Sequence, residues 1–193
     1  MDPLRVMLVD SSPDRARLLE AAITADGHAV ITTLGPAADL YAEVRRLLPD
    51  MVIVDMDIPD RDVLEHMRSI SRDQPRPVVM FSGEHGQEAI ADAVRAGVSA
   101  YVVDGLDPRR LGPIMEVAIA RFREFQILRQ ELEQTRLQLS DRRVVERAKG
   151  LLMQHRNLSE GDAFNALRKL AMDRNQRLGD AARNVIAVFD ALG

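Results

Sequence analysis

The sequence predicts an α/β domain with a parallel sheet, followed by an all-α region. Five short apolar runs alternate with segments of helical pattern over about the first 120 residues. A long stretch with coiled-coil spacing comes next, and short amphipathic segments complete the chain. A hydrophobic content of 46% over 193 residues is enough to support a core.

The expected strands are runs rich in apolar, strand-forming residues. Pro13 favours a helix directly after the first strand, because the N–H that proline lacks is not needed in the first helical turn. Alternation of strands and helices indicates a parallel sheet with helices on both faces. We expect strands at residues 4–9, 29–31, 51–54, 78–81 and 100–103, and helices at residues 13–25, 37–48, 62–72 and 87–96.

Polar side chains follow the expected strands. Asp10 and Ser11 come after the first strand, Asp55 after the third, Ser82 after the fourth and Asp104 after the fifth. Binding sites on open parallel sheets lie at the carboxyl ends of the strands. We therefore interpret these residues as one candidate site.

This pattern, over about 120 residues, resembles a response-regulator receiver domain. The resemblance implies a flavodoxin-like fold with strand order 2-1-3-4-5. It implies that Asp55, which is followed by Ile58-Pro59, lies at the phosphoacceptor position. It also implies that Asp10 is the first of two adjacent acids that hold Mg²⁺, and that Ser82 contacts the phosphoryl group.

Two departures from the receiver pattern concern charge. Ser11 stands where the second acid is usual, and Asp104 replaces the lysine that usually follows the fifth strand. A phosphoryl group brings about two negative charges, and each close charge–charge term is worth several kcal/mol even at an effective dielectric of about 20. We therefore expect a degenerate Mg²⁺ site at Asp10 and Asp55, no required cofactor, and a receiver that does not depend on phosphorylation. Asp57 is an alternative source of a carboxylate ligand.

A long helical stretch begins at Asp107-Pro108. Its apolar residues follow the three–four spacing of a coiled coil, which favours a parallel homodimer. A helix that packs back on its own receiver is the alternative. The expected seam positions are Leu111, Ile114, Ala118, Arg121, Phe125, Leu128, Leu132, Thr135 and Leu139.

The tail begins with a helix that carries an unusual glycine. Val144, Val145, Ala148, Leu151 and Leu152 form its apolar stripe. The glycine that follows Lys149 costs about 1 kcal/mol relative to alanine inside a helix. A close approach by another backbone, of protein or nucleic acid, is the usual compensation.

The segments 146–153 and 167–175 resemble the ANTAR module, a small three-helix RNA-binding domain of transcription antiterminators. The resemblance covers roughly the last quarter of the chain. Together the two resemblances imply a receiver-like domain at 1–120, a coiled-coil connector at 121–139 and an ANTAR domain at 140–193.

RNA loops are read by stacking and by hydrogen bonds to base edges. The tail has no Trp or Tyr, and Phe164 and Phe189 are expected in its core, so stacking would fall to arginine planes. The candidate RNA-binding residues are Arg174 and Arg177 for stacking, Asn175 for a base edge, Lys149 for phosphate or a loop base, and Ala148 and Gly150 for close approach of the RNA. Capping of helix carbonyls is the alternative interpretation of Arg174 and Arg177, and a solvated helix face is the interpretation of Arg168 and Lys169.

Composition excludes several classes of protein. There is no cysteine, so disulfide and cysteine–metal scaffolds are excluded. Nucleotide-binding, metalloprotease and nucleophile-elbow motifs are missing, so we expect no enzyme. No apolar run approaches the length of a membrane span, so we expect a cytoplasmic protein. Residues 141–193 hold 10 Lys/Arg and 7 Asp/Glu, for a charge of +3, against −7 in the rest of the chain.

The resemblances imply an antiterminator that binds paired stem-loops in leader mRNA. The whole chain looks like the nitrate-assimilation antiterminators of the NasT type, in which a nitrate-sensing protein partner sequesters the regulator. The amide-responsive AmiR type is a close alternative. A phosphorylation-driven response regulator that binds DNA and a pure dimerisation module are alternatives from other classes.

Overall fold

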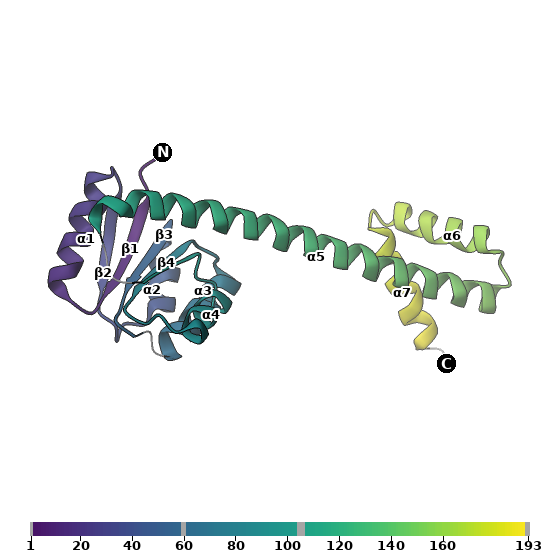
Figure 1. Ribbon diagram of the computed structural model, residues 1–193. Helices are drawn as coiled ribbons and strands as arrows, with labels where there is room; N and C mark the ends of the chain where they lie inside the picture. Colours follow the sequence, from purple (N-terminus) through teal and green to yellow (C-terminus); the bar gives the residue numbers. More distant parts are fainter. Residues whose placement is uncertain (1, 59–60, 104–106, 192–193) are drawn as a thin grey trace. The chain divides into compact units, whose positions relative to one another are not determined.

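The computed structural model describes residues 2–58, 61–103 and 107–191 (Figure 1). The chain forms two compact units, Met1–Gln126 and Ile127–Gly193. The domain limits at residues 120 and 139 that the sequence suggests stay a prediction.

The first unit is built on a five-stranded parallel sheet in the order β2-β1-β3-β4-β5, which confirms the expected topology. Every central strand is an apolar run buried on both sides, as parallel sheets covered by helices require. The register pairs Asp10 with Asp55, so these acids end two adjacent strands at the same edge. The strands are β1 (Arg5–Asp10), β2 (Ala29–Leu34), β3 (Met51–Asp55), β4 (Val78–Ser82) and β5 (Ala100–Val103).

Helices cover both faces of this sheet (Figure 1). Successive strand residues point to opposite faces, so Met7 packs against one set of helices and Leu8 against the other. One core joins the sheet to α2 (Leu40–Leu47), α3 (Arg61–Asp73) and α4 (Gln87–Arg95). The other joins it to α1 (Pro13–Ala25) and to the first turns of α5 (Leu111–Arg156).

Helix α5 is a single helix of 46 residues. A short 3₁₀ turn, η1 (Pro108–Arg110), precedes it. The sequence predicts a helical stretch before residue 139 and a tail helix from residue 142, and the structure has no break between them. The same helix therefore completes the sheet core at one end and carries the tail stripe at the other.

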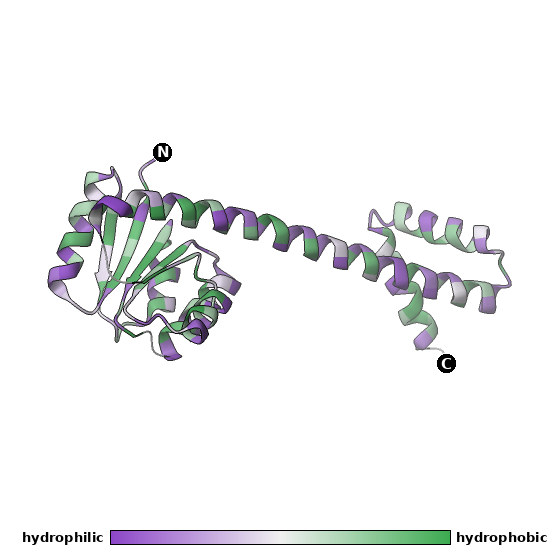
Figure 2. Cartoon of the chain, viewed as in Figure 1, coloured by the Kyte–Doolittle hydropathy of each residue, from purple (hydrophilic) through white to green (hydrophobic). Residues whose placement is uncertain are grey.

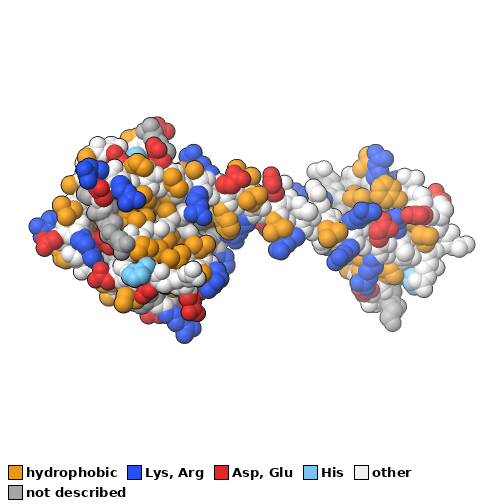
Figure 3. Space-filling model, viewed as in Figure 1, with side chains coloured by type: hydrophobic (Ala, Val, Ile, Leu, Met, Phe, Trp, Pro, Cys, Tyr) orange, Lys and Arg blue, Asp and Glu red, His pale blue; other side chains and the backbone are white. Residues whose placement is uncertain are grey.

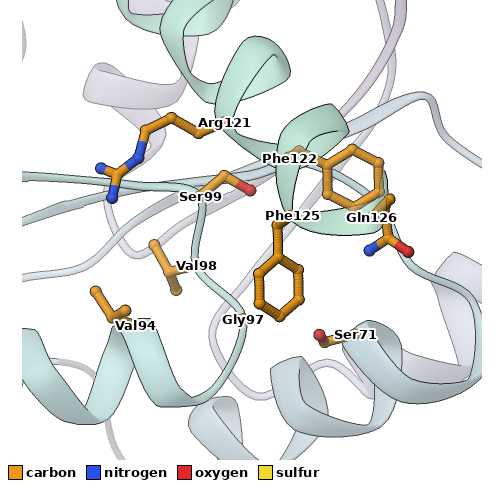
Figure 4. A pocket seen from close by; sticks show the side chains of 9 residues that line it. All are labelled: Ser71, Val94, Gly97, Val98, Ser99, Arg121, Phe122, Phe125 and Gln126. Atoms are coloured by element: carbon orange, nitrogen blue, oxygen red, sulfur yellow. The ribbon is translucent and has the colours of Figure 1, made fainter. Parts of the chain in front are cut away.

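The start of the predicted coiled-coil seam lies against the first unit. Figure 4 shows Arg121 and Phe125 of α5 beside Val98 and Gly97 of the turn before β5, around a hollow of about 130 Å³. Only glycine suits that turn, because Gly97 has a φ of +99° and a Cβ there would lie 2.5 Å from Cβ of Ser71. Arg121 and Phe125, two of the predicted seam positions, therefore line a hollow of their own unit.

Seam residues further along α5 are open to solvent. Leu128, Leu132 and Leu139 are 54%, 51% and 53% exposed. Figure 3 shows hydrophobic side chains between charged ones along this stretch, and Figure 2 shows the same alternation on the ribbon. Half-exposed leucines at heptad spacing are apolar surface that this chain leaves uncovered.

The second unit packs the end of α5 against α6 (Glu160–Asp173) and α7 (Leu178–Asp190). Its buried core includes Val145, Ala148, Leu167 and Ala182. The small alanines let the helices approach closely. The expectation that Phe164 lies in the core was wrong, since the ring is 40% exposed at the surface of α6. Among the described residues, no helix is both long and apolar enough to cross a membrane.

Candidate functional site

The first candidate site lies at the carboxyl ends of β1 and β3. Asp10 and Asp55 are 6% and 7% exposed, so both carboxylates are buried. Backbone N–H of Ser12 donates to Oδ1 of Asp10 over 2.6 Å. The other oxygen of Asp10, Oδ2, is buried without a hydrogen-bond partner in the described structure.

Arg15 brings a positive charge into this pocket. It lies in the first turn of α1, where Oγ of Ser12 caps the helix and accepts from the N–H of Arg15. Its Nε lies 3.7 Å from Oδ1 of Asp10 and 3.5 Å from Oδ2 of Asp55. Its Nη1 donates to Oδ1 of Asp57 over 3.0 Å, and its Nη2 donates to Oγ of Ser11 over 3.0 Å. One guanidinium therefore faces every oxygen-bearing side chain expected to hold metal here.

The charges in the pocket perturb one another. Burial raises the pKa of the Asp55 carboxyl above its ordinary value; Arg15 opposes that rise, and Asp10 and Asp57 add to it. The hydrogen bond to Asp57 is the main reason why the pKa of Arg15 is raised, with the two buried aspartates adding to it and burial opposing it. The ionised Asp55 is thus disfavoured by its burial, and Arg15 offsets part of that cost.

The residues present do not fit the Mg²⁺ ion that the fold class implies. Mg²⁺ needs oxygens at close to 2.1 Å in octahedral geometry, yet the guanidinium of Arg15 already contacts the oxygens of Ser11 and Asp57 and lies beside those of Asp10 and Asp55. Among the described residues, no group of three or more acidic, histidine or cysteine side chains could hold a metal ion. Sequence reasoning did not single out Arg15, whose guanidinium lies among these oxygens; the degenerate Mg²⁺ site stays a prediction.

Ser82 lies at the end of β4, and its hydroxyl is occupied by backbone. It donates to the carbonyl of Asp57 and accepts from the N–H of Glu84, each over 3.0 Å. The hydroxyl of Tyr101 donates to the carbonyl of Glu84 over 2.8 Å. These bonds join the loops after β3 and β4. Asp104, the residue that replaces the usual lysine, lies outside the described residues.

The second candidate site is the surface of the helical unit. Lys149, expected to meet phosphate, is 8% exposed. Its Nζ donates to both carboxylate oxygens of Glu146 over 3.0 Å and to Oε1 of Glu160 over 2.7 Å. These bonds raise the pKa of Lys149, with Glu160 the main cause, and Lys149 lowers the pKa of Glu160. Lys149 therefore ties α5 to the start of α6.

The two small residues beside Lys149 have different surroundings. Ala148 is fully buried in the core of the three helices. Gly150 is exposed on α5, and a Cβ built on it would meet no described atom within 4 Å. A tight helix–helix contact inside this chain therefore does not explain the glycine.

Arg174, Asn175 and Arg177 form the turn between α6 and α7, and all three are exposed. Asn175 has a φ of 50°, and the N–H of Gln176 donates to the carbonyl of Ala171, which closes the end of α6. Asparagine tolerates this left-handed conformation better than most residues, so the turn itself accounts for Asn175. Arg177 occupies the N-cap position of α7.

The structure separates these residues into two hollows. Arg174 lines a hollow of about 470 Å³ with Arg156 and apolar side chains that include Val185 and Phe189. Asn175 lines another, of about 460 Å³, with Arg168, Phe164 and Met172. At a rise of 1.5 Å per residue, about 20 Å of helix axis lie between Glu160, the partner of Lys149, and Arg174. One RNA base cannot contact both ends of α6.

Sequence reasoning missed Arg15 and Glu160. For Arg15, the available signal was its place in the first turn after Asp10, at the edge of the sheet where the site was expected. For Glu160, the signal was an acid directly after Ser159, the N-cap of α6. Arg15 binds Asp57, which is distant in the sequence, and Glu160 binds Lys149, which lies on another helix.

Comparison with known proteins identifies both parts of the chain. Residues 6–115 match the response regulator receiver domain, and residues 133–186 match the ANTAR domain. The transcriptional regulatory protein PdtaR of Mycobacterium tuberculosis is similar over almost the full length, with 29% identity over 184 residues, 95% of this chain and 90% of that protein.

Several other relatives match the receiver part of the chain. A protein-glutamate methylesterase/protein-glutamine glutaminase of Agrobacterium fabrum is 34% identical over 96 residues, which are 48% of this chain and 27% of that enzyme. A two-component response regulator of the LuxR family from an Aurantimonas species aligns with a TM-score of 0.55 and 29% identity, over 62% of this chain and 86% of that one. A CheY-like receiver domain of Methanospirillum hungatei aligns with the same TM-score and 20% identity, over 64% of this chain and 99% of that one. This similarity supports the fold alone.

Proposed function

Because this chain belongs to the response regulators and joins their receiver domain to an ANTAR domain, we propose that it is an RNA-binding transcription antiterminator. The helical unit binds stem-loops in a leader transcript and prevents a terminator hairpin from forming. The similarity to a transcriptional regulator over 95% of the chain supports this role. The methylesterase relatives share about a quarter of their length with the chain, so their chemistry is not part of the proposal.

The observation that carries the RNA proposal is the open space beside Gly150. A glycine inside a helix is unfavourable by about 1 kcal/mol relative to alanine, and no described atom of this chain lies close enough to account for it. A ligand backbone that approaches the helix would account for it. Lys149, one residue earlier, is buried and paired with Glu146 and Glu160, so it adds no free positive charge to that surface.

The turn after α6 offers the second contact. Arg174 and Arg156 border an apolar hollow whose volume of about 470 Å³ falls in the usual range for small-molecule pockets. Unstacked RNA bases pack on arginine planes and apolar side chains. We assign Arg174 to such a base, and Asn175 and Arg177 to neighbouring edges or phosphates.

We propose that the chain works as a homodimer through α5. The half-exposed Leu128, Leu132 and Leu139 follow heptad spacing, so a second copy of the same helix would cover them. Two helical units in one dimer bind two hairpins, and tethering raises the effective affinity without any new contact.

Control by a ligand-sensing protein, rather than by phosphorylation, fits the charges of the receiver pocket. Arg15 already faces Asp55, and Ser11 supplies no second acid. We propose a nitrate-sensing partner and nitrate-assimilation genes as targets, with the amide-responsive type as the alternative. A DNA-binding regulator driven by phosphorylation is the competing function.

The test is a titration of the full-length protein against a two-hairpin leader RNA and against duplex DNA, at several salt concentrations. RNA should bind more tightly, and the slope of log affinity against log salt should be about −0.7 per phosphate contacted on single strands. Equal affinity for the RNA and the duplex would overturn the proposal. Arg17→Ala, a change of equal charge in the receiver, is the matched control for changes at Arg174.

A further inference from the structure

The receiver pocket holds a feature that its family resemblance does not explain. A guanidinium lies among the acids at the edge of the sheet, where receivers place a divalent metal. We propose that Arg15 is the resident cation of this pocket, and that removing its guanidinium turns the pocket into a Mg²⁺ site. This inference concerns the first unit and does not rest on RNA binding.

The geometry supports exchange between the guanidinium and a metal ion. Nε of Arg15 lies within 3.7 Å of carboxylate oxygens on both Asp10 and Asp55. Its two terminal nitrogens bind Asp57 and Ser11. A metal ion bound to the same oxygens would lie in contact with the guanidinium, so the two cations compete.

The guanidinium leaves one oxygen of Asp10 without a partner in the described part of the chain. Oδ2 of Asp10 is buried and has no hydrogen-bond partner among the described residues. The side chain of Asp10 has no exposed surface, whereas that of Arg15 is 37% exposed. The guanidinium can therefore leave towards solvent, while the carboxylate stays in place.

The charges of the site predict that Mg²⁺ affinity rises when Arg15 is replaced. Asp10, Asp55 and Asp57 carry three formal negative charges, and Arg15 supplies one positive charge. Arg15→Gln leaves the three carboxylates uncompensated and keeps a neutral polar side chain, shorter than arginine, at this position. Carboxylate oxygens are the ligands that Mg²⁺ prefers in proteins. The variant should therefore attract the ion that the natural pocket excludes.

The experiment compares Mg²⁺ binding by full-length wild type, Arg15→Gln and Arg17→Gln, using isothermal titration calorimetry and the shift in melting temperature with Mg²⁺. Arg17 lies on the same helix and pairs with Asp14 over 3.1 Å outside the pocket, so its variant matches the change in charge. We expect Arg15→Gln to bind Mg²⁺ at least about tenfold more tightly than wild type, because a repelling charge at contact distance is removed. Arg17→Gln should behave as wild type.

A second variant locates the metal. Adding Asp10→Asn to Arg15→Gln should abolish the gain in affinity. Equal Mg²⁺ affinity of wild type and Arg15→Gln would overturn the proposal, as would a gain that survives Asp10→Asn. If Arg15→Gln is unfolded without metal, recovery of its circular dichroism in Mg²⁺ supports the proposal, and failure to recover at saturating Mg²⁺ contradicts it.

Discussion

Replacing Gly150 by alanine should make the protein more stable and worse at binding RNA. The residue lies inside α5, is exposed, and has no described atom within 4 Å of an added Cβ. The methyl group therefore meets no obstacle within the chain. The helix should gain about 1 kcal/mol, the usual difference between glycine and alanine.

For a unit the size of Ile127–Gly193, a gain of about 1 kcal/mol corresponds to a rise of roughly 4–8 °C in melting temperature. If RNA approaches the helix at Gly150, the same methyl group should weaken binding by at least about tenfold, or about 1.4 kcal/mol. Melting curves followed by circular dichroism measure the first effect. Fluorescence anisotropy with a labelled two-hairpin RNA measures the second.

Gly161→Ala is the matched control. Gly161 lies in the first turn of α6, and its Cβ would meet only Oγ of Ser159, at 3.9 Å. This variant should fold as well as wild type and keep full RNA affinity. Gly150→Ala with a higher melting temperature and unchanged RNA affinity would refute the RNA contact. A lower melting temperature would refute the packing argument and indicate that a second chain fills the space.

Three further changes test other parts of the structure. Glu160→Gln should lower the melting temperature at neutral pH and have little effect in acid. Lys149 lowers the pKa of Glu160 below its ordinary value of 4.5. The pair therefore stabilises the fold above pH 4.5, and this stabilisation is lost as the pH falls through the pKa of Glu160 in the folded protein. An equal change in melting temperature at neutral and acid pH would contradict the pairing. Leu132→Glu should convert the proposed dimer to a monomer, as measured by light scattering, whereas Gln134→Glu, off the seam, should not; a dimeric Leu132→Glu protein would rule out the seam. Arg174→Ala should weaken RNA binding and change stability by less than about 0.5 kcal/mol, because the residue is exposed; a large loss of stability would assign Arg174 to structure.

The sequence determined the sheet and the edge where the acids meet. Apolar strands that alternate with helices can only be buried between two helical layers, and the strands then share one direction. Asp10 and Asp55 directly follow two such strands, so they lie at one edge, and the register pairs them. The heptad spacing of Leu128, Leu132 and Leu139 likewise indicates an apolar stripe on α5, and these leucines are half-exposed.

The tertiary structure decided which cation meets which acid. Arg15 and Lys149 have long side chains, and nothing local fixes where their charged ends lie. Folding brings Asp55 and Asp57 beside Arg15 from a strand end some 40 residues away, and it brings the start of α6 against Lys149. Pattern in the sequence fixes backbone direction and burial, whereas a charge on a flexible stem pairs with whichever opposite charge packing brings within its reach.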